Sequence, residues 1–243
     1  MRSMFRYYVL VILLLMQSIS YAQQQDVDSA QYLFNELKAK LDRVEDYTAD
    51  VRVNIDVSFM KVPPLAGKLY FKAPDKMKLE RKGGISILPK KNMSLALNTV
   101  FPEGDITIID AGNDVLDGTP VKVIKIVPHN DVAGIVLTKV WVDKERLLAL
   151  RTETTTRDNG TVKMDLDFGK YANLALPDKV TVYVDVKEFK IPKGVTMDYD
   201  AGTAGKMEAP KDDGKRKKGK ISINYLQYNV NAGLADSVFD ENE

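Results

Sequence analysis

The residues that could perform catalysis are few and form no recognised arrangement. The chain has one histidine, His129, and no cysteine. A histidine can act as a general acid or base, but nucleophilic catalysis also needs a serine or cysteine beside it, and no such pattern surrounds His129. Asp165 and Asp167 could form a glycosidase-type pair, but strand alternation already explains their spacing. No GxGxxG, P-loop or HExxH motif occurs. We therefore interpret His129 as a loop residue and expect a protein that is not an enzyme and needs no cofactor.

One aspartate-rich run carries the oxygen ligands that a cation such as Ca²⁺ prefers. It contains Asp110, Asn113, Asp114 and Asp117. Calcium loops of the EF-hand type have a stricter spacing and end in a glutamate, and this run has neither. We interpret 110–118 as a hairpin loop, with a cation site as the alternative, and predict no metal.

Alternation of polar and apolar side chains identifies the element around which the rest is built. From Tyr47 to Phe59 every odd position is apolar or aromatic and every even position is polar. Successive strand side chains point to opposite faces, so this pattern predicts one long strand with one apolar face. Weaker strand patterns follow at 67–72, 76–81, 106–109, 121–127, 137–142, 147–156, 161–168, 180–186 and 221–230.

These patterns predict a mainly β, α+β fold built on a single sheet of about ten strands, mostly antiparallel because the connections are short. Asn159-Gly160 is a strong hairpin signal. Residues 26–45 form an amphipathic pattern with leucines four apart, which predicts a helix. The segment 83–104 is apolar on several sides, and part of it, 92–101, is a candidate short helix.

The apolar face of the sheet is either buried by the predicted helix and the 83–104 segment or left to bind a ligand, and the relative widths of sheet and helix distinguish these cases. Ten strands about 4.8 Å apart span nearly 50 Å, whereas a helix is about 10 Å wide. Unless the sheet curls and fills its own interior, a cavity for an apolar ligand remains. We expect it to be lined by Val51, Val53, Ile55, Val57, Leu69, Phe71, Met77, Leu79, Trp141, Leu148, Leu150, Met164, Leu166 and Phe168. We expect its lid to contain Leu33, Leu37, Leu41, Leu88, Met93, Leu95, Leu97 and Phe101.

The N-terminus has the pattern of a secretory signal peptide. Arg2 and Arg6 precede an apolar run at 9–16, and Ser20-Tyr21-Ala22 places small residues at the cleavage positions. The apolar run is shorter than the roughly 20 residues of a spanning helix. We expect cleavage after Ala22, a single domain over 23–243, and a soluble protein in the exported compartment. Without cysteine, that domain has no disulfides.

The segment 187–220 is rich in glycine, proline, lysine and aspartate. Its second part, 206–220, holds seven basic and three acidic residues. We interpret the segment as a mobile loop, and a contact of Lys215, Arg216, Lys217 and Lys218 with anionic head groups or an acidic partner is the alternative. The formal net charge of the whole chain is +1, which gives no global reason to expect nucleic acid.

Four stretches resemble the superfamily of periplasmic lipoprotein carriers, LolA and LolB, and the lipid-binding sensors and carriers that share their fold. Leu41 to Ala49 resembles that superfamily's passage from helix to first strand. Gly67 to Met77 resembles its first hairpin, the section from Val140 to Gly160 resembles its later strand–turn–strand section, and Leu234 to Phe239 resembles its C-terminal segment. The four occur in the same order as in the superfamily and span most of the chain.

The resemblance implies an open, curved antiparallel half-barrel whose concave face, covered by helices, takes acyl chains. It implies a monomeric periplasmic carrier of lipoprotein acyl chains or another lipid, which could meet a membrane transporter or an outer-membrane acceptor. The carrier proper has an arginine just before the hairpin proline that ties its lid shut, and here that position is Ala73. A different lid mechanism is therefore expected. The alternative is a lipid-sensing or protein-interaction module of the same fold.

Overall fold

A computed structural model describes residues 30–57, 60–61, 64–81, 86–87, 101, 104–130, 134–157, 160–186 and 217–240. The expected signal peptide, 1–22, lies outside the described residues. So do Leu88, Met93, Leu95 and Leu97, the expected helical segment 92–101 apart from Phe101, and residues 187–216 with Lys215 and Arg216.

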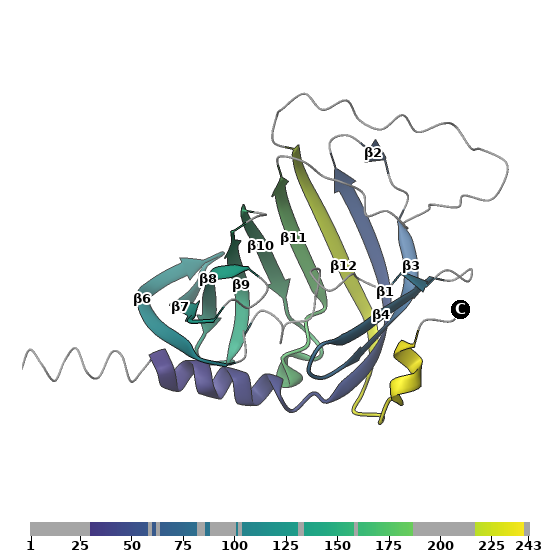
Figure 1. Cartoon of the computed structure of the whole chain (residues 1–243), viewed down its shortest axis with the longest axis horizontal. Coiled ribbons are helices and arrows are strands. Elements are labelled where there is room, and N and C mark those ends of the chain that lie inside the picture. The colour runs from purple at the N-terminus through teal and green to yellow at the C-terminus, as the bar shows by residue number, and fades with distance from the viewer. Residues whose placement is uncertain are drawn as a thin grey trace, which may run out of the picture.

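One open antiparallel sheet contains all twelve strands of the described residues (Figure 1). Its order is β5-β4-β3-β1-β12-β11-β10-β9-β8-β7-β6, and β2 pairs with β1. The long strands are β1 (Asp46–Val57), β3 (Leu65–Lys72), β4 (Lys76–Arg81), β6 (Ile106–Leu116), β7 (Thr119–Pro128), β8 (Ile135–Asp143), β9 (Leu148–Thr156), β10 (Gly160–Asp167), β11 (Lys179–Val186) and β12 (Lys217–Val230). The short elements are β2 (Met60–Lys61), β5 (Ser86–Ile87) and the 3₁₀ helices η2 (Ala172–Leu174) and η3 (Asp236–Phe239).

The sheet is strongly curved, with β6–β9 at one end and β3–β4 at the other (Figure 1). Its end strands do not pair with each other, so the sheet does not close. The predicted fold class, an open curved half-barrel, is therefore confirmed. The strand at 46–57, which the alternation identified first, lies between β3 and the C-terminal strand β12.

Two local predictions were wrong. The run 110–118 is not a hairpin loop, because β6 continues to Leu116 and only Asp117 and Gly118 form the turn. The strand crosses this polar run through a bulge between Asp110 and Asn113, and the Asp110 carboxylate forms an ion pair with the Lys122 ammonium of β7. Burial alone would raise the pKa of Asp110, but hydrogen bonds from Lys122 and Gly112 hold it below its ordinary value.

The second correction concerns the basic segment. Strand β12 begins at Lys217, so Lys217 and Lys218 pair with Val186 and Asp185 of β11 and do not belong to a loop. The first four residues of β12 are three lysines and a glycine, so polar and apolar side chains do not alternate there. The start of this strand could therefore not be predicted from the sequence.

The helix covers one half of the concave face. Residues 30–41 are helical, and the chain leaves the helix where the Asp42 and Val44 N–H groups donate to the Lys38 and Leu41 carbonyls. Within the described part of the chain, no helix has the length and hydrophobicity to cross a bilayer. The helix packs on β6–β9 in what we call the helix cluster: Ala30, Leu33, Phe34, Leu37, Phe101, Ile108, Ile124, Ile126, Val140, Val142 and Ala149.

A second apolar cluster lies on the other half of the sheet, and we call it the strand cluster. Its buried members are Val44, Tyr47, Ala49, Val51, Val53, Leu69, Phe71, Met77, Met164, Leu166, Leu176, Val180, Val182, Ile223, Tyr225 and Tyr228. Register explains how one face collects them, since Tyr47 pairs with Phe71, Val51 with Tyr225 and Val180 with Ile223.

A buried carboxylate fastens the C-terminal segment to the start of β1. Asp46 accepts hydrogen bonds from the N–H groups of Ala232, Gly233 and Leu234 at 2.9, 2.9 and 3.2 Å. Asn231 accepts from the Glu45 N–H at 2.9 Å. The segment then continues into η3, beside β4.

Replacing Asp46 with alanine is expected to lower the free energy of unfolding by about 2–3 kcal/mol, because three backbone donors lose their acceptor. Asp50→Ala on the same strand is the matched control. Asp50 is exposed, and its lysine partner lies 3.9 Å away, so its removal should cost less than about 0.5 kcal/mol. Urea denaturation measures both, and equal losses would contradict the assignment.

Candidate functional site

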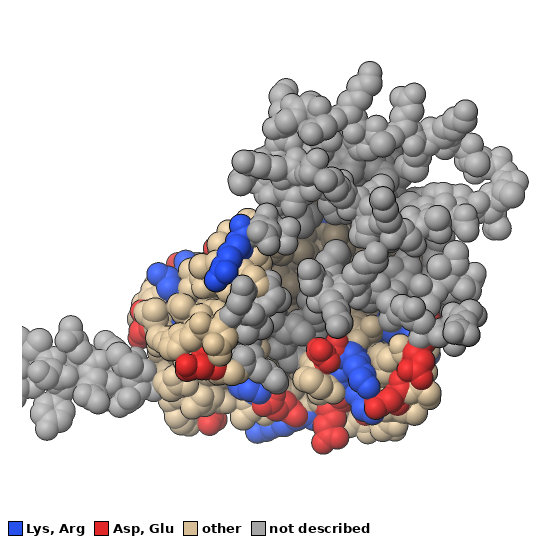
Figure 2. All heavy atoms as spheres, in the orientation of Figure 1, with Lys and Arg blue, Asp and Glu red and all other residues tan. Residues whose placement is uncertain are grey.

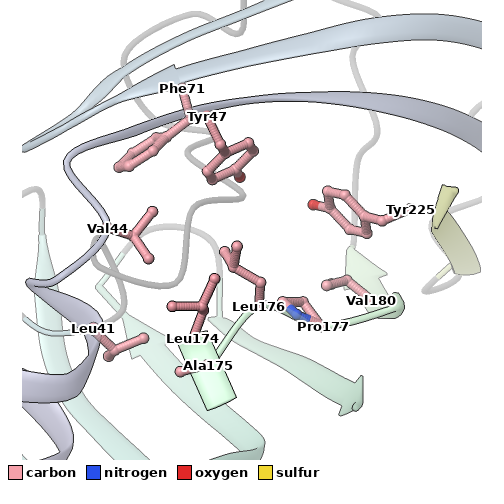
Figure 3. Close-up of a pocket in the computed structure, with 10 residues that line it drawn as sticks. All are labelled: Leu41, Val44, Tyr47, Phe71, Leu174, Ala175, Leu176, Pro177, Val180 and Tyr225. Carbon is pink, nitrogen blue, oxygen red and sulfur yellow. The ribbon is translucent and has the colours of Figure 1, made fainter. Parts of the chain in front are cut away.

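A small cavity lies where the end of the helix meets the strand cluster. Its volume is about 30 Å³, and Figure 3 shows its lining residues. They come from the helix end and the passage that follows it, from β1, β3, β11 and β12, and from the η2 turn: Leu41, Val44, Tyr47, Phe71, Leu174, Ala175, Leu176, Pro177, Val180 and Tyr225. None of these ten described residues is charged, so the site suits an apolar ligand.

The η2 turn places three apolar side chains in the cavity. The Ala175 N–H donates to the Ala172 carbonyl and the Leu176 N–H donates to the Tyr171 carbonyl. Ala175 adopts a left-handed φ of 53°, which reverses the chain sharply after Leu174. The side chains of Leu174 and Leu176 consequently face Val44 across the cavity (Figure 3).

Packed aromatic rings form one wall. The Tyr47 ring stacks on Phe71 at 5.1 Å and meets the edge of Tyr228 at 5.2 Å between centroids. Tyr225 stacks on Tyr228 at 5.2 Å, and Tyr171 meets the same ring at 5.0 Å. Tyr228 is therefore the centre of the group, and the rings of Tyr47 and Tyr225 are each fixed against it.

The three buried tyrosines differ in what their hydroxyl groups do. The Tyr228 hydroxyl donates to the Pro177 carbonyl at 2.7 Å. Within the described part of the chain, the hydroxyls of Tyr47 and Tyr225 make no hydrogen bond, and in Figure 3 both point into the space above Leu176. Burial raises the pKa of Tyr47 and of Tyr225. Both therefore stay neutral and can donate a proton in a hydrogen bond.

The volume of the cavity limits what it can hold in this conformation. A water molecule needs at least about 10–15 Å³, so about 30 Å³ accommodates one or two waters and not an acyl chain. Binding a lipid would therefore require side chains or the η2 turn to move. Among the ten described lining residues, those outside the strands lie in two stretches, at 41–44 and 174–177.

The structure brings most of the expected lining residues together. Val51, Val53, Leu69, Phe71, Met77, Met164 and Leu166 are buried in the strand cluster, and Ile55, Leu79 and Phe168 pack against it. Of these, only Phe71 lines the cavity. The side chain of Val57 lies outside the description.

Three expected lining residues lie elsewhere. Trp141 packs with Val121 and Val123 in a separate cluster, with Leu150 against it. Trp141 lies between Val140 and Val142, which pack in the helix cluster, so strand alternation places its side chain on the face of the sheet away from the helix. Leu148 is fully buried at the start of β9, opposite Asp143.

The four expected lid residues that the structure describes belong to the other half of the molecule. Leu33, Leu37 and Phe101 are buried in the helix cluster, and Phe34 meets Phe101 at 5.8 Å between ring centroids. Leu41 packs against the helix cluster and also lines the cavity. Near the helix end, the Lys40 ammonium donates to the Arg146 carbonyl at 2.7 Å, which ties the helix to the β8–β9 turn. The helix is thus a wall of the site, and its last residue is the part that touches the cavity.

The polar residues that the sequence offered as candidates for catalysis or metal binding lie outside this cavity. Asp165 forms an ion pair with Arg151, and Asp114 accepts a hydrogen bond from the Trp141 indole at 2.9 Å. His129 contacts Asp105 at 3.0 Å at an exposed corner. On the face seen in Figure 2, the lysines and arginines of the described residues are interspersed with carboxylates and form no single patch.

Sequence reasoning missed the tyrosines of β12. Tyr225 and Tyr228 are three positions apart, and a regular strand would place them on opposite faces. The register shift opposite Asp50 and Val51 leaves Leu226 unpaired, and Leu226 is 60% exposed. This bulge turns both tyrosines inward. The bulge could not be predicted from the pattern of residues in the sequence.

Comparisons with known proteins support the fold. No family model and no curated protein matches the sequence. A LolA superfamily protein from Nitrosomonas europaea has a TM-score of 0.54 at 10% identity, over 87% of this chain and 97% of that one. A domain described as an outer membrane lipoprotein-sorting protein from Vibrio parahaemolyticus has 0.53 at 10%, over 88% and 97%. A DUF1329 family protein from Desulfovibrio piger has 0.52 at 14%, over 88% and 97%. At such identities the likeness concerns the fold alone.

Proposed function

We propose that this chain, which has the fold of the LolA-superfamily structures, is a periplasmic carrier that binds acyl chains of a lipoprotein or of another lipid. The observation that supports the proposal is the uncharged cavity between the end of the helix and the strand cluster. Around it, the strand cluster supplies further apolar and aromatic side chains, which are buried in the core. The proposal describes a binding protein and includes no catalytic step.

Affinity would come from removing methylene groups from water, at about 0.8 kcal/mol for each one buried. The ligand must first enlarge the site, because about 30 Å³ does not hold an acyl chain. Opening the cavity requires the least free energy where few hydrogen bonds between strands break. This favours movement of the η2 turn away from Leu41 and Val44. The Ala73 N–H donates to the Glu45 carbonyl at 2.8 Å, so this hairpin position holds the passage from helix to β1 through its backbone.

The cargo would pass between membranes, so a transporter that releases it and an acceptor that receives it are the expected partners. A head-group or partner contact by Lys215, Arg216, Lys217 and Lys218 stays part of the proposal. Of these, the described residues Lys217 and Lys218 begin β12 at its pairing with β11.

Purification from the native host, followed by organic extraction and mass spectrometry, tests the proposal. We expect an acylated molecule at close to one equivalent of protein, and uptake of an acylated fluorescent probe by the extracted protein. A protein that is empty on isolation and also fails to take up the probe would refute a carrier role.

A protein-interaction module of the same fold is the second candidate, and the small size of the cavity favours it. A volume of about 30 Å³ is that of a nearly filled core. Under this alternative the isolated protein carries no lipid, and acyl probes do not change its melting temperature. Under the carrier proposal, a saturating probe raises that temperature, because a ligand that binds only the folded state stabilises it.

A further inference from the structure

We propose that the hydroxyl groups of Tyr47 and Tyr225 bind the carbonyl oxygen of a neutral acyl group, an ester or an amide, at the polar end of the cavity. The inference rests on the proposed carrier function and adds to it a chemical class of ligand. It commits to a neutral acyl carbonyl in preference to a free fatty acid or a hydrocarbon.

Geometry supplies the first argument. The two tyrosines come from β1 and β12, and their hydroxyls point into the same space (Figure 3). Tyr47 is 6% exposed and Tyr225 is 7% exposed. Each ring packs against Tyr228 at a centroid distance of 5.2 Å, so neither phenol can turn away without breaking aromatic contacts. The two donors are therefore held in place before any ligand arrives.

The second argument is that these two hydroxyls have no hydrogen-bond partner among the described residues. Phenylalanine would fill the same space, so the hydroxyls are groups that a ligand oxygen in the cavity can use. Tyr228, in the same cluster, does have an acceptor in the Pro177 carbonyl. The cavity beside Tyr47 and Tyr225 has room for one or two waters, which an oxygen of a ligand can replace.

The chemistry of the lining selects the ligand. A carbonyl oxygen has two lone pairs and can accept from both phenols. None of the ten described lining residues is a lysine or arginine, so these residues offer a carboxylate no counter-charge, and burying a carboxylate against them is strongly unfavourable. A neutral ester or amide therefore fits better than a fatty acid anion, and better than an alkane, which would leave both hydroxyls unpaired.

Displacement of the fluorescent probe N-phenyl-1-naphthylamine tests this with three competitors of similar length: methyl decanoate, decanoate at pH 8 and undecane, all supplied from methyl-β-cyclodextrin. In the unaltered protein, methyl decanoate should compete better than decanoate. Tyr47→Phe and Tyr225→Phe should each weaken methyl decanoate about five- to tenfold, the effect of one lost hydrogen bond, and leave undecane unchanged or slightly tighter.

Tyr70→Phe is the matched control. Its hydroxyl donates to Glu80 at 2.9 Å and lies outside the cavity, so it should not alter any competitor. Tyr47→Phe and Tyr225→Phe both keep the aromatic ring. The melting temperature of each variant shows whether it is folded. If the probe and undecane bind but the phenylalanine variants weaken the ester and the alkane equally, the carbonyl site is refuted and the carrier proposal stands. If neither the probe nor any competitor binds, both fail.

Discussion

Replacing Leu41 with tryptophan is expected to reduce uptake of an acyl probe about tenfold or more while leaving the protein folded. Leu41 is the last helical residue, is partly exposed, and lines the cavity from the helix side. An indole there would occupy the space into which the ligand must enter. Overpacking of this kind costs about 1–3 kcal/mol, which in a binding equilibrium is about tenfold or more. A titration with the acylated probe measures the change.

Tyr32→Trp is the matched control, because it places the same indole on the same helix at a position that is 66% exposed. It should bind the probe as the unaltered protein does. Circular dichroism and the melting temperature establish that both variants are folded. Equal uptake by Leu41→Trp and Tyr32→Trp would show that the ligand does not enter beside the helix end.

The second large effect concerns stability. Leu37→Ala is expected to lower the free energy of unfolding by about 2–5 kcal/mol, the range for a buried leucine truncated to alanine. Leu37 is completely buried in the helix cluster between the helix and β6–β9. Alanine is a better helix former than leucine, so the loss comes from packing and not from helix propensity. Urea denaturation gives the value.

Asn35→Ala, at an exposed position of the same helix, should change stability by less than about 0.5 kcal/mol. The comparison separates two views of the helix. If the helix is part of the core, truncating Leu37 lowers the free energy of unfolding of the protein by the amount given above. A lid that opens freely would lose less than about 1 kcal/mol, and such a result would contradict the assignment of the helix to the core.

Most strands could be predicted from the sequence because apolar and polar side chains alternate along them, although β7 and part of β8 are buried on both faces. Tyr47 to Phe59 gave the clearest signal, and it corresponds to β1, Asp46–Val57. The same rule failed at 110–118, where β6 passes through a bulge and most of its side chains are exposed. Its Asp110 is paired with Lys122 on a neighbouring strand, and a pairing between strands leaves no trace in local alternation.

The candidate site was only partly predictable. Alternation placed Val51, Leu69 and Phe71 on one face, but the face was divided between two clusters by the curvature of the sheet. Trp141 is large and apolar, but it lies between Val140 and Val142 of the helix cluster, so strand alternation sets it on the other face.

The most specific part of the site depends on a bulge. Tyr225 and Tyr228 share a face only because Leu226 is left out of the pairing with β1. The polar end of the cavity therefore follows from a feature of the backbone. Its consequence is chemical, since it brings the hydroxyl of Tyr225 to the same space as that of Tyr47 (Figure 3).

Photo-crosslinking tests the central claim, that an acyl chain binds in the cavity between the helix end and the strand cluster. A methyl ester of a fatty acid with a diazirine on its chain would be bound, irradiated and located by mass spectrometry of peptides. We expect crosslinks in the peptides that contain 41–47, 171–180 and 223–228, and their loss in Leu41→Trp. Crosslinks confined to the opposite face, around Trp141, or no crosslinks at saturating ligand, would contradict the account.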